Sequence, residues 1–134
     1  MYYLLAINSV WWYIGIGYVV IALAVYFIQE KFIFRPERLP QNFEYKYDVP
    51  FKELFFEVEP GVSINGLHFY CTQPHGLILY FHGNTRSIKG WAKYARDFYC
   101  YNYDVVLVDY RGFGKSTGRR NEKDMLSDMQ FVYD

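Results

Sequence analysis

The first 28 residues contain no charged side chain, and this stretch constrains the fold more than any other part of the sequence. The first charges are Glu30 and Lys31. Residues 10–28 (VWWYIGIGYVVIALAVYFI) supply the roughly 20 apolar residues that a helix needs to cross a bilayer. A buried core helix is the alternative, but such a helix would rarely run this long without a polar face. The sequence therefore predicts one transmembrane helix within residues 1–30.

A cleaved signal peptide is the competing interpretation of this apolar stretch. Residues 22–24 (Ala-Leu-Ala) have the small-x-small pattern of a cleavage site. However, no Lys or Arg precedes the apolar run, whereas signal peptides begin with a positively charged region. An uncleaved membrane anchor is therefore favoured, and export after signal cleavage is the alternative.

Positive charges beside the apolar run predict the orientation of the chain. Lys31, Arg35 and Arg38 flank its C-terminal end. Because Lys and Arg are retained on the cytoplasmic side of membranes, we expect a single-pass protein whose remaining part faces the cytoplasm. The lipid bilayer is then the expected partner of residues 1–30.

Composition excludes several other classes of protein. Lys and Arg number 14, equal to Asp and Glu, so the net charge is zero and a nucleic-acid partner is not expected. A hydrophobic share of 52% excludes a disordered tail. Cys71 and Cys100 are too few for a disulfide framework, and with three histidines they lack the spacing of metal ligands. The sequence predicts no metal and no cofactor.

A different composition follows the apolar run. Residues 31–50 (KFIFRPERLPQNFEYKYDVP) contain three prolines and mixed charges without a steady period. They predict an extended, largely solvated juxtamembrane connector, in which Phe32, Phe34 and Leu39 are able to dock on a neighbouring surface. The remaining domain would then comprise residues 51–134.

Residues 51–134 alternate between strand-like and helix-like patterns, which predicts an α/β fold. Residues 76–81 and 104–109 are apolar runs of the kind found in strands buried on both faces. Because a helical pattern separates them, these two strands should lie parallel in one sheet. The expected strands are 53–58, 62–70, 76–81 and 104–109, with a turn at Pro60-Gly61, and the expected helices are 88–100 and 121–134, the latter capped by Asn121.

The loop after strand 76–81 is the first candidate site, since open α/β sheets bind ligands at the carboxyl ends of their strands. It reads His82-Gly83-Asn84. Gly83 permits a tight backbone path that leaves the Asn84 amide free to face an anion, as in the oxyanion hole of acyl transfer. His82 invites a catalytic assignment, but catalysis would need a nucleophile within reach. We therefore predict that His82 supports the loop.

The loop after strand 104–109 is the second candidate site. Residues 114–118 (GKSTG) fit the G-x-S-x-G pattern of a nucleophile elbow, which requires a sharp turn directly between strand and helix. Here the strand ends at Asp109 or Tyr110, several loop residues before Ser116. Ser116 is therefore predicted to be a loop-stabilising hydroxyl. A phosphate-binding P-loop is also excluded, because position 109 is not a glycine.

The order of these motifs resembles the α/β-hydrolase fold, and most closely the membrane-anchored α/β-hydrolase-domain proteins of the serine-hydrolase type. The apolar anchor, the Phe-Ile-Phe-Arg-Pro segment at 32–36, the HGN loop and the DYRGFGKSTG loop follow one another as in that family. The resemblance implies an antiparallel hairpin that leads into a parallel sheet with flanking helices. It also implies that the Asn84 amide belongs to an oxyanion hole supported by His82 and Gly83. The implied structural turn after the fourth strand contains Asp109, Arg111, Gly112, Gly114 and Ser116.

The resemblance also implies that part of the family's catalytic machinery is missing from this chain. In the family, the nucleophilic serine, the acid and the histidine follow the helix that here begins near Asn121. We therefore expect none of the triad in this chain, which would be the N-terminal part of a membrane-anchored hydrolase of ester, thioester or amide bonds. Its substrate would be a small acyl compound or a lipidated molecule, and the 134-residue chain would be inactive. The alternative is a short, non-catalytic membrane protein that pairs with another chain through the exposed edge of strand 76–81.

Overall fold

The computed structural model describes residues 2–134, with side chains from residue 10 onward. The chain divides into one unit that ends at Phe34 and a second unit that begins at Arg35. The first unit is the single helix α1 (Tyr2–Ile33), which extends three residues beyond the predicted boundary at residue 30. From Val10 to Ile33 it is long and apolar enough to cross a membrane, and almost every side chain there is exposed. An anchor and a signal sequence both have these properties.

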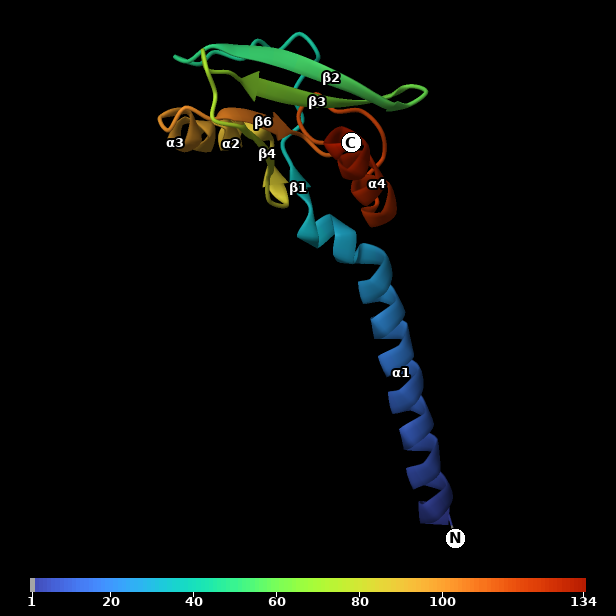
Figure 1. Cartoon of the computed structure of the whole chain (residues 1–134). Coiled ribbons are helices and arrows are strands. Elements are labelled where there is room, and N and C mark those ends of the chain that lie inside the picture. The colour runs from blue at the N-terminus through green and yellow to red at the C-terminus, as the bar shows by residue number, and fades with distance from the viewer. Residues whose placement is uncertain (1) are drawn as a thin grey trace. The chain divides into compact units, whose positions relative to one another are not determined.

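The second unit is built on a four-stranded sheet (Figure 1). Its order is β2 (Phe51–Glu59), β3 (Val62–Phe69), β6 (Asp104–Val108) and β4 (Leu77–Phe81). β2 and β3 form the predicted antiparallel hairpin, and Gly61 adopts φ +80° at its turn. β3 is antiparallel to β6, whereas β6 and β4 form the predicted parallel pair. The predicted α/β class is therefore confirmed.

The helical segment between β4 and β6 is less regular than predicted. Instead of one helix over residues 88–100, it consists of α2 (Ile88–Trp91), a 3₁₀ turn (Ala92–Tyr94) and α3 (Ala95–Tyr99). None of these pieces has a side-chain N-cap, which is consistent with their short length.

The burial of β4 corrects one expectation. β4 pairs only with β6 and lies at the edge of the described sheet, as expected for strand 76–81 in a partial fold, but it is not buried on both faces as its apolar sequence predicted. Leu77 and Phe81 are 63% and 41% exposed. β6 lies between two partners and is buried from Val105 to Val108, as predicted.

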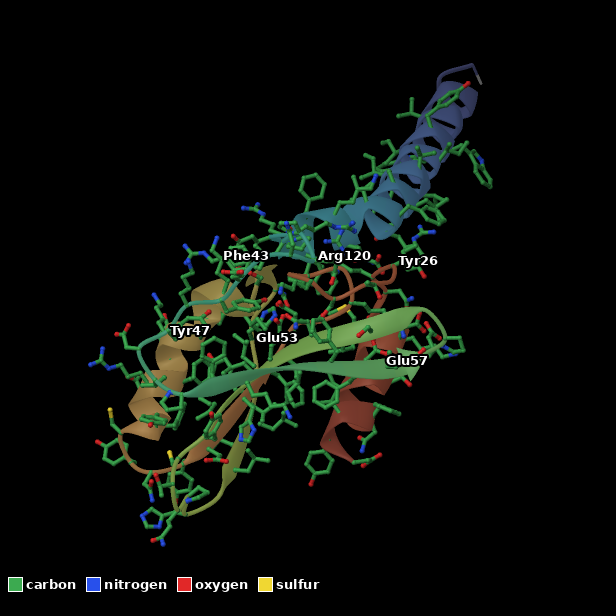
Figure 2. The ribbon with its side chains drawn as sticks, turned by 90° about the horizontal axis from the view of Figure 1, so that it is seen from above. Tyr26, Phe43, Tyr47, Glu53, Glu57 and Arg120 are labelled. Carbon is green, nitrogen blue, oxygen red and sulfur yellow. The ribbon has the colours of Figure 1, made fainter. Side chains whose placement is uncertain are left out.

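The connector is less solvated than predicted, because apolar side chains of residues 35–49 pack on the core, and Leu39 docks there as expected. Apolar side chains recur at every second position from Phe43 and pack on the sheet. Figure 2 shows Phe43 and Tyr47 along this segment and Glu53 on the neighbouring β2. The resulting core joins the connector, α2–α3 and one face of the sheet: Leu39, Phe43, Tyr45, Tyr47, Val49, Leu67, Phe69, Ile88, Ala92, Ala95, Val105 and Leu107.

A smaller core forms around Ile64, Val106 and Val108 of β3 and β6. The helix α4 (Glu122–Tyr133) packs against it through Met129 and Val132. Asn121 is its N-cap, as predicted, and its side-chain oxygen accepts a hydrogen bond from the Asp124 N–H at 2.9 Å.

The connector and the segment after the first candidate loop form a two-stranded parallel ribbon, which was not predicted. It pairs β1 (Arg35–Pro36) with β5 (Thr85–Arg86). The Arg35 N–H donates to the Asn84 carbonyl at 2.9 Å, and the Glu37 N–H donates to the Arg86 carbonyl at 3.1 Å. The connector therefore braces the segment that follows the HGN motif.

Candidate active site

His82 links the two candidate loops. Its Nε2 lies 3.0 Å from Asp109 Oδ1, and its Nδ1 lies 2.6 Å from the Gly83 carbonyl oxygen. The side chains of His82 and Asp109 are both fully buried. The structure thus gives His82 hydrogen-bond partners on both ring nitrogens, and neither partner is a serine.

These contacts fix the peptide between Gly83 and Asn84. The chain has no cis peptide among the described residues, so the carbonyl and the N–H of this peptide point in opposite directions. Because His82 Nδ1 donates to the Gly83 oxygen, the Asn84 N–H is directed away from the histidine. Within residues 2–134, this N–H forms no hydrogen bond, and Asn84 is exposed. A donor held this way can bind an anionic oxygen.

The hydrogen bond between His82 and Asp109 requires a proton between them, and this proton belongs either to the imidazole or to the carboxyl group. Both ring nitrogens face oxygens, so either an imidazolium faces a carboxylate, or a neutral ring accepts from a protonated Asp109 and donates from Nδ1. The pair is neutral overall in both cases. Burial raises the pKa of the Asp109 carboxyl, while hydrogen bonds from His82 and from the Ile88 N–H at 2.9 Å oppose this rise.

Aromatic rings surround the His82 imidazole. Trp91 stacks on it at 6.1 Å between centroids, and Tyr110 and Phe113 approach at 4.8 and 5.4 Å. The Tyr110 hydroxyl also donates to the His82 carbonyl at 2.8 Å. Burial raises the pKa of that hydroxyl, so it remains a donor at neutral pH. The imidazole therefore has little freedom to rotate.

The second loop wraps around the Asp109 carboxyl. Gly114 adopts φ +48°, and a Cβ added there would overlap Asp109 Oδ2 and approach Ser87. Only glycine allows both the positive φ and the missing Cβ that position 114 requires. Gly112 of the same loop also has a positive φ, +72°. Gly83, by contrast, lies outside the left-handed region, and an added Cβ would meet Trp91 at an ordinary 3.5 Å.

Ser116 braces the same loop. Its hydroxyl donates to the Asp109 carbonyl at 2.9 Å and accepts from the Asn65 N–H at 2.8 Å. The side chain is buried. This geometry is that of a structural hydroxyl, since a nucleophile would need a base as its acceptor.

Arg111 ties the second loop to two other elements. Its guanidinium donates to both carboxylate oxygens of Asp128 on α4, at 2.6 and 2.7 Å, and to Glu59 at the end of β2 at 2.7 Å. The bonds to Asp128, followed by those to Glu59, raise the pKa of Arg111 above its usual range. Arg111 and Asp128 are both buried, so this pair is shielded from solvent.

A buried polar network that the sequence reasoning missed lies beside Ser116. Asn65 accepts from the Tyr45 hydroxyl at 3.0 Å and donates to Glu53 at 2.8 Å. Glu53 in turn accepts from the ammonium group of Lys115 at 2.9 Å. An asparagine inside a strand is unusual and could have signalled this network. Within residues 2–134, no group of three or more His, Cys, Asp or Glu side chains has the arrangement of a metal site.

Known proteins are similar to this chain in sequence and in fold. Residues 72–134 match a family model described as serine aminopeptidase, S33. The fold resembles that of the esterase Pf2001 of Pyrococcus furiosus, with a TM-score of 0.54 and 21% sequence identity. The matched region covers 73% of this chain and 38% of the esterase. The chain carries a partial α/β-hydrolase fold. The predicted resemblance to α/β-hydrolases is thereby confirmed for a partial fold that follows an N-terminal apolar helix.

Individual relatives of this partial hydrolase are longer proteins. It is 30% identical to protein bem46 of Schizosaccharomyces pombe over 121 residues, which are 82% of this chain and 40% of that protein. It is 41% identical to the lysophosphatidylserine lipase ABHD12 of Danio rerio over 61 residues, 44% of this chain and 16% of that protein. The chain therefore spans well under half the length of these curated relatives.

Proposed function

We propose that this partial hydrolase provides the oxyanion loop of a serine hydrolase that cleaves ester, thioester or amide bonds. The observation that carries the proposal is the Asn84 N–H, which is left free while His82 holds the carbonyl of the same peptide. When a serine attacks an acyl carbonyl, negative charge develops on the carbonyl oxygen. A fixed N–H at about 2.7–3.1 Å from that oxygen stabilises the transition state more than the ground state.

A lipid substrate fits the features of the chain. The exposed apolar surface of α1 suits a membrane anchor, with the second unit on the cytoplasmic side. One relative is named a lysophosphatidylserine lipase and another a probable lysophospholipase L2. We therefore propose an acyl chain carried by a phospholipid or another lipidated molecule as the substrate.

The 134-residue chain is proposed to be inactive by itself. The Ser116 hydroxyl is hydrogen-bonded to backbone groups of Asp109 and Asn65. Both ring nitrogens of His82 are also hydrogen-bonded, to the Gly83 carbonyl and to the Asp109 carboxyl. Among the described residues, no hydrogen bond joins a serine hydroxyl to a histidine ring. A fluorophosphonate probe should therefore leave the purified chain unlabelled, and p-nitrophenyl butyrate should not be hydrolysed. Labelling that Ser116→Ala abolishes would contradict this part of the proposal.

A chimera tests the oxyanion role directly. Residues 1–134 are joined to the part of the Danio rerio lipase that follows its matched segment. Folding is checked by circular dichroism. We expect hydrolysis of lysophosphatidylserine that neither half shows alone. A folded chimera without activity would contradict the proposal.

A non-catalytic role is the second candidate, and the exposed edge of β4 favours it. Leu77 and Phe81 expose apolar surface beside unpaired backbone groups, which is a template for pairing with another chain. Hydrogen exchange of the β4 amides in native membranes separates the two candidates. Slow exchange that is lost on purification of the 134-residue chain would indicate a partner strand supplied by another protein.

A further inference from the structure

An open groove of about 630 Å³ lies over the β1–β5 ribbon. It is not used by the oxyanion chemistry, although β5 begins directly after Asn84. Three of its lining side chains are cationic and one is acidic. The lining residues are Arg35, Pro36, Glu37, Thr85, Arg86, Lys89 and Gly90.

The charges of this groove are only partly balanced. Glu37 accepts hydrogen bonds from Lys89 and from the Ser87 hydroxyl, both at 2.9 Å. The bond from Lys89 lowers the pKa of Glu37, so this acid is a carboxylate at neutral pH. Three cations and one carboxylate leave two net positive charges. Among the described residues, neither Arg35 nor Arg86 has a carboxylate oxygen within 4.0 Å.

The backbone beneath the groove is held in place. The Trp91 indole donates to the Thr85 carbonyl at 2.9 Å, and the Glu37 N–H donates to the Arg86 carbonyl at 3.1 Å. Arg86 adopts φ +67°, a left-handed conformation that is uncommon for a residue other than glycine. Its side chain lies against Gly90, where an added Cβ would meet Arg86 Cδ at 3.3 Å. Such outliers persist only where the surrounding structure fixes them, and they gather at binding sites.

We propose that this groove binds the phosphate group of an anionic phospholipid. A guanidinium fork matches the geometry of phosphate oxygens, and the groove offers two guanidinium groups with no carboxylate oxygen within 4.0 Å among the described residues. Arg35 follows Ile33, the last residue of α1, by only two positions. Insertion of α1 in a bilayer would therefore keep Arg35 within reach of the lipid headgroups. Binding of the phosphate requires no catalysis by this chain, so the proposal does not depend on the hydrolase function.

The test uses the full 134-residue chain in neutral detergent micelles, with water-soluble dihexanoyl phosphatidic acid as the probe. The test variant is Arg35→Gln with Arg86→Asn, because asparagine tolerates the left-handed conformation at position 86. The matched control is Arg96→Gln with Arg119→Gln, which removes two exposed cations outside the groove. Circular dichroism verifies that both variants fold.

We expect the test variant to bind the probe at least about tenfold more weakly, since each cation near a headgroup contributes a several-fold effect. The control variant should remain within about twofold of the parent chain. Equal binding by the test variant would overturn the proposal. Tighter binding of inorganic phosphate than of the lipid would also overturn it, in favour of free phosphate. Tighter binding of an acidic peptide would assign the groove to a protein instead.

Discussion

His82 Nε2 lies 3.0 Å from Asp109 Oδ1, and this buried contact joins loops that follow two different strands, β4 and β6. The same imidazole holds the Gly83 carbonyl through its other nitrogen. Asp109 therefore acts on the oxyanion loop indirectly, because its contact with Nε2 keeps a proton on Nδ1, which donates to the Gly83 carbonyl in both arrangements of the pair. Each loop depends on the other for its geometry.

Asp109→Asn tests this coupling. An asparagine oxygen can accept from both His82 Nε2–H and the Ile88 N–H, but the neutral ring then turns a lone pair toward the Gly83 carbonyl. We expect the free energy of unfolding to fall by about 2–4 kcal/mol and hydrogen exchange of the Asn84 amide to accelerate. Urea unfolding and mass spectrometry measure the two effects. Asp97→Asn, at an exposed position of α3, is the control and should change stability by less than about 0.5 kcal/mol.

Gly114→Ala should be among the most damaging small substitutions in the chain. The new Cβ overlaps the Asp109 carboxyl, and the residue must also keep φ +48°. Together these effects should cost at least about 3 kcal/mol of unfolding free energy. Gly83→Ala is the matched comparison, since its Cβ meets Trp91 at 3.5 Å without a positive φ, and it should cost less than about 1 kcal/mol. Equal losses in thermal unfolding would refute this account of the loop.

Arg111→Lys tests the buried ion pair between Arg111 of the second loop and Asp128 of α4. A lysine keeps the charge but cannot donate to both oxygens of Asp128 in the geometry of a fork. We expect a loss of about 2–3 kcal/mol and faster hydrogen exchange throughout α4. Arg119→Lys, at an exposed position, should leave both measurements nearly unchanged.

The pH dependence of stability should report on Asp104. The Cys71 N–H at 2.8 Å, followed by His68 at 2.9 Å, lowers the pKa of this carboxyl in the folded state. Asp104 therefore contributes stability above its unfolded pKa of about 3.8, and this contribution disappears as the pH falls through the lower, folded pKa. Urea unfolding between pH 2 and 6 should show the loss, and Asp104→Asn should reduce it. A pH profile unaffected by that substitution would show that Asp104 is not the responsible group.

Most elements of the fold could be predicted because apolar runs and turn dipeptides are local signals. β6 and α4 begin and end within about a residue of their predicted bounds. The β1–β5 ribbon could not be predicted, because two-residue strands carry no period. The docking of the connector was predictable in principle from the alternation of Phe43, Tyr45 and Tyr47, which the prolines obscured.

The candidate site was predictable only in part. The motifs located His82, Asn84 and Ser116 on loops after strands, and the structure places them there. The pairing of His82 with Asp109 spans 27 positions, so no local pattern reveals it. The support of the loop by Gly83 stays a prediction, whereas the need for glycine at position 114 is visible only in the structure, where an added Cβ would overlap Asp109.

The most direct test of the oxyanion role compares Asn84→Pro with Asn84→Ala in the chimera that carries the lipase segment. Proline removes the backbone N–H, whereas alanine removes only the side chain and retains the donor. We predict that kcat on lysophosphatidylserine falls by about 10²–10³ in the proline variant and changes little in the alanine variant, with KM nearly constant in both. Equal kcat values for the two folded variants would contradict the assignment of the Asn84 amide to the oxyanion hole.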